Sequence, residues 1–166
     1  MSVIDEVVAA NGIYAEHFAL GHLPTPPARG LVIVACMDAR QAIFGMLGLK
    51  PGDALILRNA GGIVTDDVMR SVIVAYHLLA AREVMIINHT ECGLLSFKDD
   101  EMRAQLREAT GVAASTPEHF YAFSDLEQNV RAQIQAVKSH PWIPATITAR
   151  GFIYDVKTGR LSEVAA

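Results

Sequence analysis

Three short apolar runs, each followed along the chain by a stretch with helical signals, constrain this sequence more than any other feature. They are Leu31–Ala35, Ala54–Leu57 and Val84–Ile87. A run in which apolar and polar residues do not alternate is typical of a strand buried on both faces of a parallel sheet. Because parallel strands are joined by crossovers, the segments between the runs are expected to be helices. The sequence therefore predicts an α/β fold with a mostly parallel central β-sheet flanked by helices.

The remaining elements are predicted from caps, helical spacing and turn residues. Helices are expected at residues 2–20, 41–47, 65–82, 99–110 and 124–139. The last of these begins at a capping box that runs from Ser124 to Glu127. At the C-terminus, Thr146–Val156 is rich in strand-forming residues, and the turn at residues 157–160 leads to a further run, Leu161–Val164. The C-terminus is therefore expected to add an edge hairpin to the sheet.

The chain length of 166 residues is typical of one domain, so residues 1–166 are expected to form a single unit. Residues 1–30 are interpreted as a helical N-terminal arm followed by a proline-rich connector, and residues 31–166 as the α/β core. Hydrophobic residues make up 51% of the chain and charged residues 19%. A small domain with this much apolar material and a separate arm is expected to be one subunit of a homodimer or a larger homo-oligomer.

The charge balance argues against two classes of partner. Fourteen basic and 18 acidic residues give a formal net charge of −4, which offers no basic field for nucleic acid or for an anionic membrane surface. The first residues lack the positive region that begins a secretory signal, and the longest apolar runs are too short to span a bilayer. The sequence predicts a cytoplasmic protein with no membrane contact.

Three clusters of chemically distinctive residues follow the three predicted strands. They are Cys36–Arg40, Arg58–Gly62 and His89–Gly93. The carboxyl ends of parallel strands share one edge of the sheet, and ligands bind at that edge. The three clusters are therefore expected to meet there and to form a single site.

Two thiols and one imidazole in these clusters have the composition of a zinc site. His89 and Cys92 are three residues apart, and Cys36 follows a neighbouring strand. A Cys₂His set leaves a fourth tetrahedral position for water or substrate, which is typical of catalytic zinc. Three alternatives stay open at this point: cysteines buried without a ligand role, a disulfide, and a thiol nucleophile with a histidine base.

Asp38 and Arg40 lie two residues apart, so an extended segment after Cys36 would place them on one side of the chain. A bidentate contact would keep Asp38 ionised, and its carboxylate could then orient a metal-bound hydroxide or bind the zinc itself in a closed state. The simpler alternative is a surface ion pair. Ala60 and Gly61 could form a small pocket wall or a tight turn, and the motifs of nucleotide-binding loops are missing.

Taken together, these residues resemble the signature of the β-class carbonic anhydrases. The family pattern Cys-x-Asp-x-Arg is similar to residues 36–40, Arg-Asn-x-Gly to residues 58–61, and His-x-x-Cys-Gly to residues 89–93. The short chain is most similar to the compact prokaryotic branch, which also contains carbonyl sulfide and carbon disulfide hydrolases. In the plant-type branch, a Gln shortly before the first Cys contacts the substrate. No Gln lies between Met1 and Cys36, so the substrate contacts of that branch are not expected in this chain.

The resemblance implies a zinc lyase (a carbonate dehydratase), in which zinc-bound hydroxide converts CO₂ reversibly to bicarbonate. It implies Cys36, His89 and Cys92 as ligands, Asp38 with Arg40 as the catalytic dyad, and substrate contacts from the Gly93 amide. Together with the pocket wall expected at Ala60 and Gly61, these residues make up the predicted site. It also implies a dimer in which the N-terminal helix embraces the neighbouring subunit.

Two other functions are compatible with these residues. The first is hydrolysis of carbonyl sulfide or carbon disulfide to H₂S by the same attack, since these linear substrates differ mainly in size and polarity. The second, from another class, is a zinc or redox sensor in which Cys36 and Cys92 respond.

Overall fold

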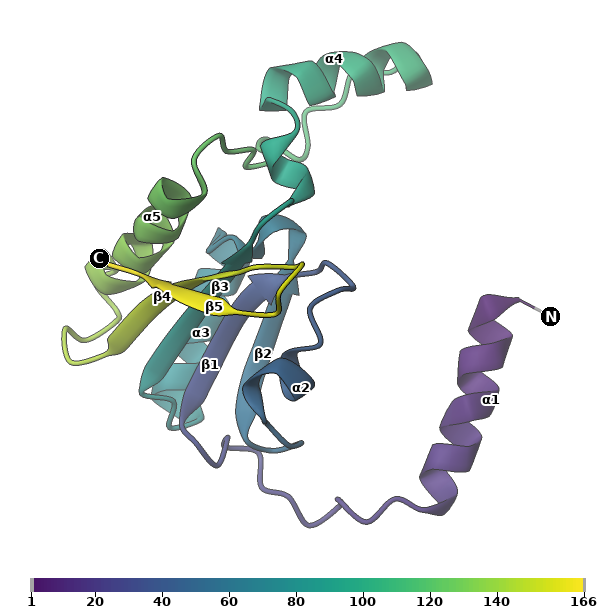
Figure 1. Cartoon of the computed structure of the whole chain (residues 1–166), viewed down its shortest axis with the longest axis vertical. Coiled ribbons are helices and arrows are strands. Elements are labelled where there is room, and N and C mark those ends of the chain that lie inside the picture. The colour runs from purple at the N-terminus through teal and green to yellow at the C-terminus, as the bar shows by residue number, and fades with distance from the viewer. Residues whose placement is uncertain (1, 166) are drawn as a thin grey trace.

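The computed structural model describes residues 2–165 and contains one five-stranded sheet (Figure 1). The strand order across the sheet is β2-β1-β3-β4-β5. The first four strands run parallel, and β5 pairs antiparallel with β4. The strands are β1 (Leu31–Cys36), β2 (Ala54–Asn59), β3 (Glu83–His89), β4 (Thr148–Tyr154) and β5 (Leu161–Val164). The predicted fold class, including the C-terminal edge hairpin, is confirmed.

Residues 2–165 also form five α-helices and two short 3₁₀ turns, of which the first helix precedes the sheet and the others lie between strands. They are α1 (Val3–Glu16), α2 (Ile43–Leu47), η1 (Ala60–Gly62), α3 (Asp66–Leu78), η2 (Gly93–Leu95), α4 (Asp99–Thr110) and α5 (Leu126–Ser139). All five helices were predicted, but several ends differ. The third ends before the expected Arg82 because Ala80 adopts a φ of +57°, which breaks the helical path.

Side-chain caps explain where the helices begin. Ser2 and Asp5 form a reciprocal capping box at the start of α1. The α5 cap was predicted one residue too early: the carboxylate of Asp125, not the hydroxyl of Ser124, accepts the hydrogen bond from the amide of Gln128. A carboxylate is the stronger partner at the positive end of the helix dipole.

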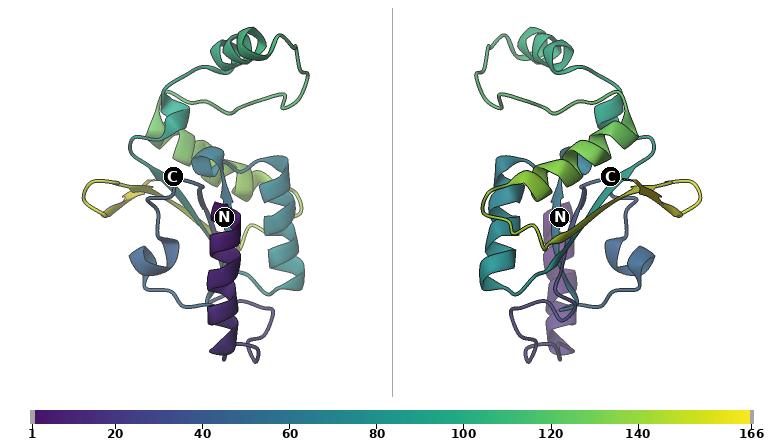
Figure 2. Two further views of the ribbon diagram at one scale, coloured as in Figure 1. Left: turned by 90° about the vertical axis from the view of Figure 1, so that its right-hand side faces the viewer. Right: turned by 90° about the vertical axis from the view of Figure 1, so that its left-hand side faces the viewer.

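The core lies on both faces of the central strands. Figure 2 shows α3 and α5 on one side of the sheet and α2 on the other. Alternate residues of β1 face the two sides, so Val34 packs in the cluster with α3 and α5, whereas Ile33 packs with Ile43 of α2. Because both faces are covered, β1 and β3 are buried along most of their length, and both strands end at the candidate site.

Strand β2 is less buried than its apolar sequence suggests. The sequence predicted a strand covered on both faces, but β2 lies at the sheet edge and its residues 54–57 are only half-buried. The apolar side chains of β2 therefore remain partly exposed to solvent in the single chain.

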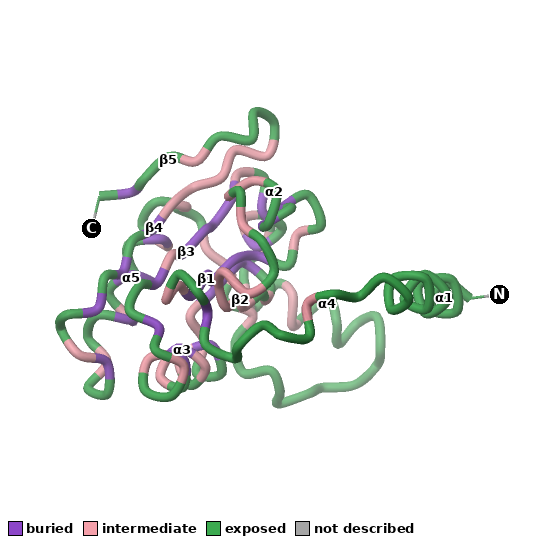
Figure 3. Tube along the Cα trace, turned by 90° about the horizontal axis from the view of Figure 1, so that it is seen from below, coloured by how far each residue is buried: buried purple, intermediate pink, exposed green. Residues whose placement is uncertain are grey.

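The N-terminal helix stands away from the core (Figures 1 and 3). No residue along α1 is buried, although the helix carries exposed apolar side chains. These are Val3, Ile4, Val7, Val8, Ile13 and Tyr14. None of the helices between residues 2 and 165 combines the length and the apolar character needed to cross a membrane.

Helix α4 and the loop after it project from one end of the molecule (Figure 2). The loop is tied back to the first residue of the helix, because Asp99 accepts hydrogen bonds from the backbone amides of residues 120–122. Burial raises the pKa of Asp99, but these three amides outweigh it and hold the pKa below its ordinary value.

Candidate metal centre

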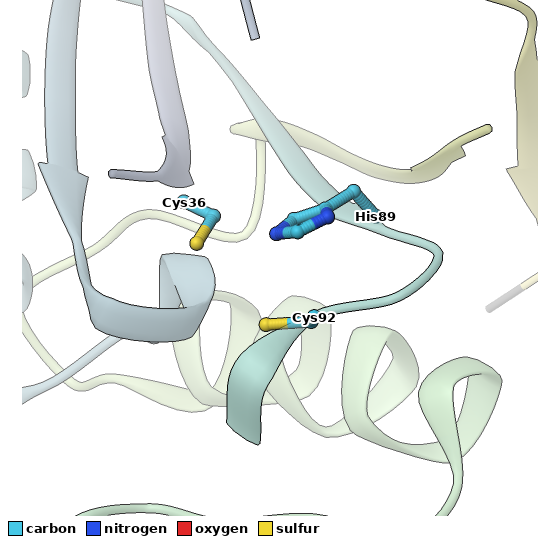
Figure 4. A group of neighbouring side chains, drawn as sticks. All are labelled: Cys36, His89 and Cys92. Atoms are coloured by element: carbon cyan, nitrogen blue, oxygen red, sulfur yellow. The ribbon is translucent and has the colours of Figure 1, made fainter. Parts of the chain in front are cut away.

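The three predicted ligands come together at the carboxyl edge of the sheet. Cys36 is the last residue of β1 and His89 the last residue of β3, and these two strands are hydrogen-bonded neighbours. Cys92 follows in the loop that leads into η2. One ligand atom from each residue lies within 4.8 Å of the other two, and all three side chains are buried (Figure 4). The predicted convergence of these three residues is observed.

His89 presents one ring nitrogen to the cysteines. Its Nδ1 lies 2.8 Å from the carbonyl oxygen of Thr90, and because a carbonyl only accepts, Nδ1 carries the hydrogen. Nε2 is then the lone-pair nitrogen, and it has no hydrogen-bond partner among residues 2–165 although it is buried. A buried acceptor without a partner is costly, so this nitrogen has the position expected of a metal ligand.

The two thiols shift each other's pKa in opposite directions. The pKa of Cys36 is lowered to about 4, chiefly because Cys92 donates a hydrogen bond to its thiolate. The pKa of Cys92 is raised because it gives that hydrogen bond and because it is buried. Both cysteines are free thiols, with no disulfide between them. Thiolate sulfur and imidazole nitrogen are the donors most often found around zinc, so the residues present fit this ion.

Asp38 and Arg40 form the expected bidentate pair. Arg40 Nη2 lies 2.7 Å from Asp38 Oδ2, and Arg40 Nε donates to Oδ1 at 3.0 Å. The hydrogen bonds from Arg40 hold the pKa of Asp38 well below its usual range. Oδ2 of Asp38 lies 3.7 Å from Nε2 of His89, which places an ionised carboxylate beside the ligand set.

The route to this pairing differs from the prediction. The chain does not stay extended after Cys36 but turns at residues 39–40, and the backbone amide of Arg40 also donates to Asp38 Oδ1 at 2.9 Å. Asp38 therefore organises its own turn.

Arg58 and Asn59 stabilise the backbone around the ligands. Arg58 donates to the carbonyl oxygens of Cys36, at 2.9 Å, and Asp38, at 2.6 Å. The side chain of Asn59 bridges the η1 turn, with hydrogen bonds of 2.8 Å to both the amide and the carbonyl of Ile63. These two residues fix the path of the segment that carries Cys36.

The glycines of η1 combine a turn with a close approach. Gly61 and Gly62 have φ angles of +81° and +64°. A Cβ on Gly62 would lie 2.8 Å from the amide nitrogen of Cys36, so the close approach is to β1 itself. Ala60 is exposed, Gly61 is buried, and Gly93 is exposed at the start of η2.

A buried side-chain amide that was not predicted from the sequence contacts the backbone of the η1 turn. Asn88 is fully buried, and its Nδ2 donates to the carbonyl oxygens of Gly61 at 2.9 Å and Gly62 at 3.2 Å. Its Oδ1 accepts from Asn129 of α5 at 2.7 Å. The signal was present, because Asn88 is a polar residue that directly follows an apolar strand run and precedes His89. Asn88 thus links β3, η1 and α5.

Comparison with known proteins agrees with this geometry. Residues 31–161 match the family model described as carbonic anhydrase. The chain is 41% identical to beta-carbonic anhydrase 1 of Mycobacterium tuberculosis, and the alignment covers 99% of both chains. The crystal structure of carbonic anhydrase from Streptococcus mutans matches with a TM-score of 0.93 and 42% identity, and covers 99% of each chain. The carbon disulfide hydrolase of Saccharolobus solfataricus is 35% identical and covers 96% of this chain and 89% of its own.

Proposed function

Because this chain belongs to the β-carbonic anhydrase family, we propose that it is a zinc enzyme that catalyses the reversible hydration of carbon dioxide to bicarbonate. The observation that carries the proposal is the buried set of two thiols and one imidazole whose Nε2 lacks a protein partner within residues 2–165. Cys36, His89 and Cys92 would hold the ion. When bound, zinc supplies the Lewis acidity that makes water a nucleophile near neutral pH.

Asp38 and Arg40 would be the catalytic dyad of this reaction. An ionised carboxylate can only accept hydrogen bonds, so Asp38 would accept one from the attacking water and orient its lone pair towards the carbon of CO₂. Arg40 holds both carboxylate oxygens and keeps them ionised. In a closed state Asp38 would turn the short distance to the ligand set and bind the ion itself.

The substrate would lie against the small residues around the ligands. Gly61 and Ala60 would form one wall, and the amide of Gly93 would donate a hydrogen bond to substrate or bicarbonate. A Cβ at Gly93 would meet no atom within 4 Å, so open space lies beside this residue on the side where a side chain would be. This supports a role for the Gly93 backbone at an accessible position.

We further propose that the protein is a homodimer in the cytoplasm. The exposed apolar side chains of α1 and the half-open edge strand β2 would be covered by a second copy. Two reduced thiols are kept most readily in a reducing compartment, which supports the cytoplasm.

A second candidate reaction is hydrolysis of carbonyl sulfide or carbon disulfide to H₂S. It is favoured by the similarity to the carbon disulfide hydrolase of Saccharolobus solfataricus, which is 35% identical to this chain, against 41% for beta-carbonic anhydrase 1 of Mycobacterium tuberculosis. The same ligands and dyad would serve it, since these substrates are also linear and attacked at carbon.

Stopped-flow measurement of CO₂ hydration by the zinc-loaded protein, run beside assays of H₂S release from carbonyl sulfide and carbon disulfide, tests both reactions. We expect CO₂ hydration to dominate and Asp38→Asn to lower it on the order of 100-fold. Asp67→Asn is the matched control, because Asp67 forms a comparable 2.8 Å pair with Arg70 on the exposed face of α3. Full zinc occupancy without either activity would exclude both reactions and favour the sensor.

A further inference from the structure

Glu91 lies between His89 and Cys92 and contacts two cations. Its Oε2 lies 3.4 Å from Nη1 of Arg40, and its Oε1 lies 2.5 Å from Nζ of Lys157. The carbonyl oxygen of Glu91 also accepts from Arg40 Nη2 at 3.3 Å. Arg40 is therefore shared between two carboxylates, those of Asp38 and Glu91.

The fold holds Lys157 in this position. Lys157 lies in the turn between β4 and β5, where the Asp155 carboxylate accepts a 2.8 Å hydrogen bond from its backbone amide. The turn is tied to the ligand loop through Thr90, whose amide donates to Tyr154 and whose hydroxyl accepts from Val156. The β3–β4 register pairs His89 with Tyr154, so the two loops leave the sheet side by side.

The backbone of Glu91 adopts an uncommon conformation. Its φ of +57° lies in the left-handed region, which residues with a side chain adopt rarely. This conformation accompanies a carbonyl group placed near Arg40 and a side chain placed near Lys157. The contacts therefore arise at a residue whose backbone is unusual for its type.

The charges make the role of Lys157 specific. An unneutralised Glu91 would attract the Arg40 guanidinium and compete with Asp38 for its hydrogen-bond donors. The ammonium of Lys157 lies 2.5 Å from the Glu91 carboxylate, whereas the Arg40 guanidinium lies 3.4 Å away, so Lys157 is the nearer of its two cationic partners. With Glu91 neutralised, the donors Nε and Nη2 of Arg40 stay on Asp38.

We propose that Glu91 and Lys157 are positioning residues of the catalytic dyad: Lys157 neutralises Glu91, and the pair keeps Arg40 in its bidentate contact with Asp38. The inference deepens the proposed function and rests on it for the effect on rate. The effect on the geometry of Arg40 can be measured separately.

The direct measurement is the exchange of the Arg40 Nε hydrogen with solvent, followed by NMR in the zinc-loaded full-length protein. This hydrogen is donated to Asp38, so its exchange reports how firmly Arg40 is held. Lys157→Met should accelerate the exchange roughly two- to fivefold, the range that an exposed ion pair provides. Lys138→Met, at an exposed lysine near the end of α5, is the matched control and should leave the exchange unchanged.

A second variant separates neutralisation from a merely structural role of the lysine. Lys157→Met should lower the CO₂ hydration rate by a similar factor, roughly two- to fivefold. Glu91→Gln in the Lys157→Met background removes the competing charge, so the exchange rate and the CO₂ hydration rate should both return to the values of the unmodified protein. Lys157→Arg should behave like the unmodified protein. Unchanged exchange in Lys157→Met, or no recovery in the double variant, would overturn the proposal.

The hydration arm distinguishes this inference from the proposed function. If the unmodified protein does not hydrate CO₂ but Arg40 exchange responds to Lys157→Met and recovers in the double variant, the proposed function fails and the positioning role stands. If the unmodified protein hydrates CO₂ and Arg40 exchange is unaffected by Lys157→Met, the positioning role is wrong and the proposed function stands.

Discussion

Two buried glutamines allow a stability prediction with opposite signs. Gln41, in the turn before α2, is 1% exposed, and neither polar atom of its side chain has a hydrogen-bond partner among residues 2–165. Gln133, on α5, is also buried, but its Oε1 accepts from the amide of Val64 and its Nε2 donates to Asn129. The same substitution to leucine should therefore stabilise one position and destabilise the other.

The magnitude follows from hydrogen bonding, because leucine and glutamine are similar in size. An unsatisfied buried amide costs about 1–3 kcal/mol, so Gln41→Leu should raise the free energy of unfolding by roughly 2 kcal/mol. For a chain of this length, 1 kcal/mol changes Tm by roughly 2–4 °C, which predicts an increase of about 4–8 °C. Gln133→Leu leaves the amide of Val64 and the oxygen of Asn129 without their partner and should lower Tm by a similar amount.

Thermal unfolding at fixed protein and zinc concentrations measures both effects, since Tm depends on each concentration when subunits and metal bind the folded state. Circular dichroism followed during heating gives the Tm of the two variants and of the unmodified protein. If Gln41→Leu lowers Tm as Gln133→Leu does, Gln41 has a partner outside this chain's own residues, and the reasoning from its isolated amide is refuted.

Three further outcomes are expected. Cys92→Ser should weaken zinc binding by more than about 100-fold in competition with a chromophoric chelator, because a neutral hydroxyl replaces a thiolate; unchanged affinity would exclude Cys92 as a ligand. Gly62→Ala should lower the free energy of unfolding, measured by denaturant titration, by on the order of 3 kcal/mol. The added Cβ would contact the backbone of Cys36, and residue 62 has a positive φ that alanine adopts at a cost. A loss below about 1 kcal/mol would contradict this. Asp99→Asn should cost about 1 kcal/mol at neutral pH. Because the pKa of Asp99 is lowered on folding from its ordinary 3.8, its contribution is present above that pH and is lost as the folded-state carboxylate becomes protonated in acid. The free energies of unfolding of Asp99→Asn and of the unmodified protein should therefore converge at low pH. A difference that does not change with pH would show that the negative charge of Asp99 does not contribute to stability.

The elements that could be predicted are those whose signal is local. The runs in β1 and β3 are continuous because these strands are covered on both faces, and helix α4 was predicted at its observed bounds because Gly111 ends it in the left-handed conformation. The convergence of Cys36, His89 and Cys92 followed from strand ends alone, since parallel strands must finish at one edge.

What could not be predicted depends on tertiary pairing. The edge position of β2 is set by strand order, which its apolar composition does not encode. The contact between Glu91 and Lys157 joins residues 66 positions apart and depends on the β3–β4 register. The turn at Asp38 was not predicted because it depends on a local hydrogen bond, in which the backbone amide of Arg40 donates to the Asp38 carboxylate. This hydrogen bond favours a turn over the extended conformation that was expected.

The most direct test of the account is a zinc titration of the metal-free protein in which the CO₂ hydration rate and the bound zinc are measured on the same samples. The proposed ligands Cys36, His89 and Cys92 would form one zinc site, so the rate should rise in proportion to bound zinc and stop rising at one ion per chain. A rate that is independent of zinc, or a protein that binds one zinc per chain and remains inactive towards CO₂, would contradict the account.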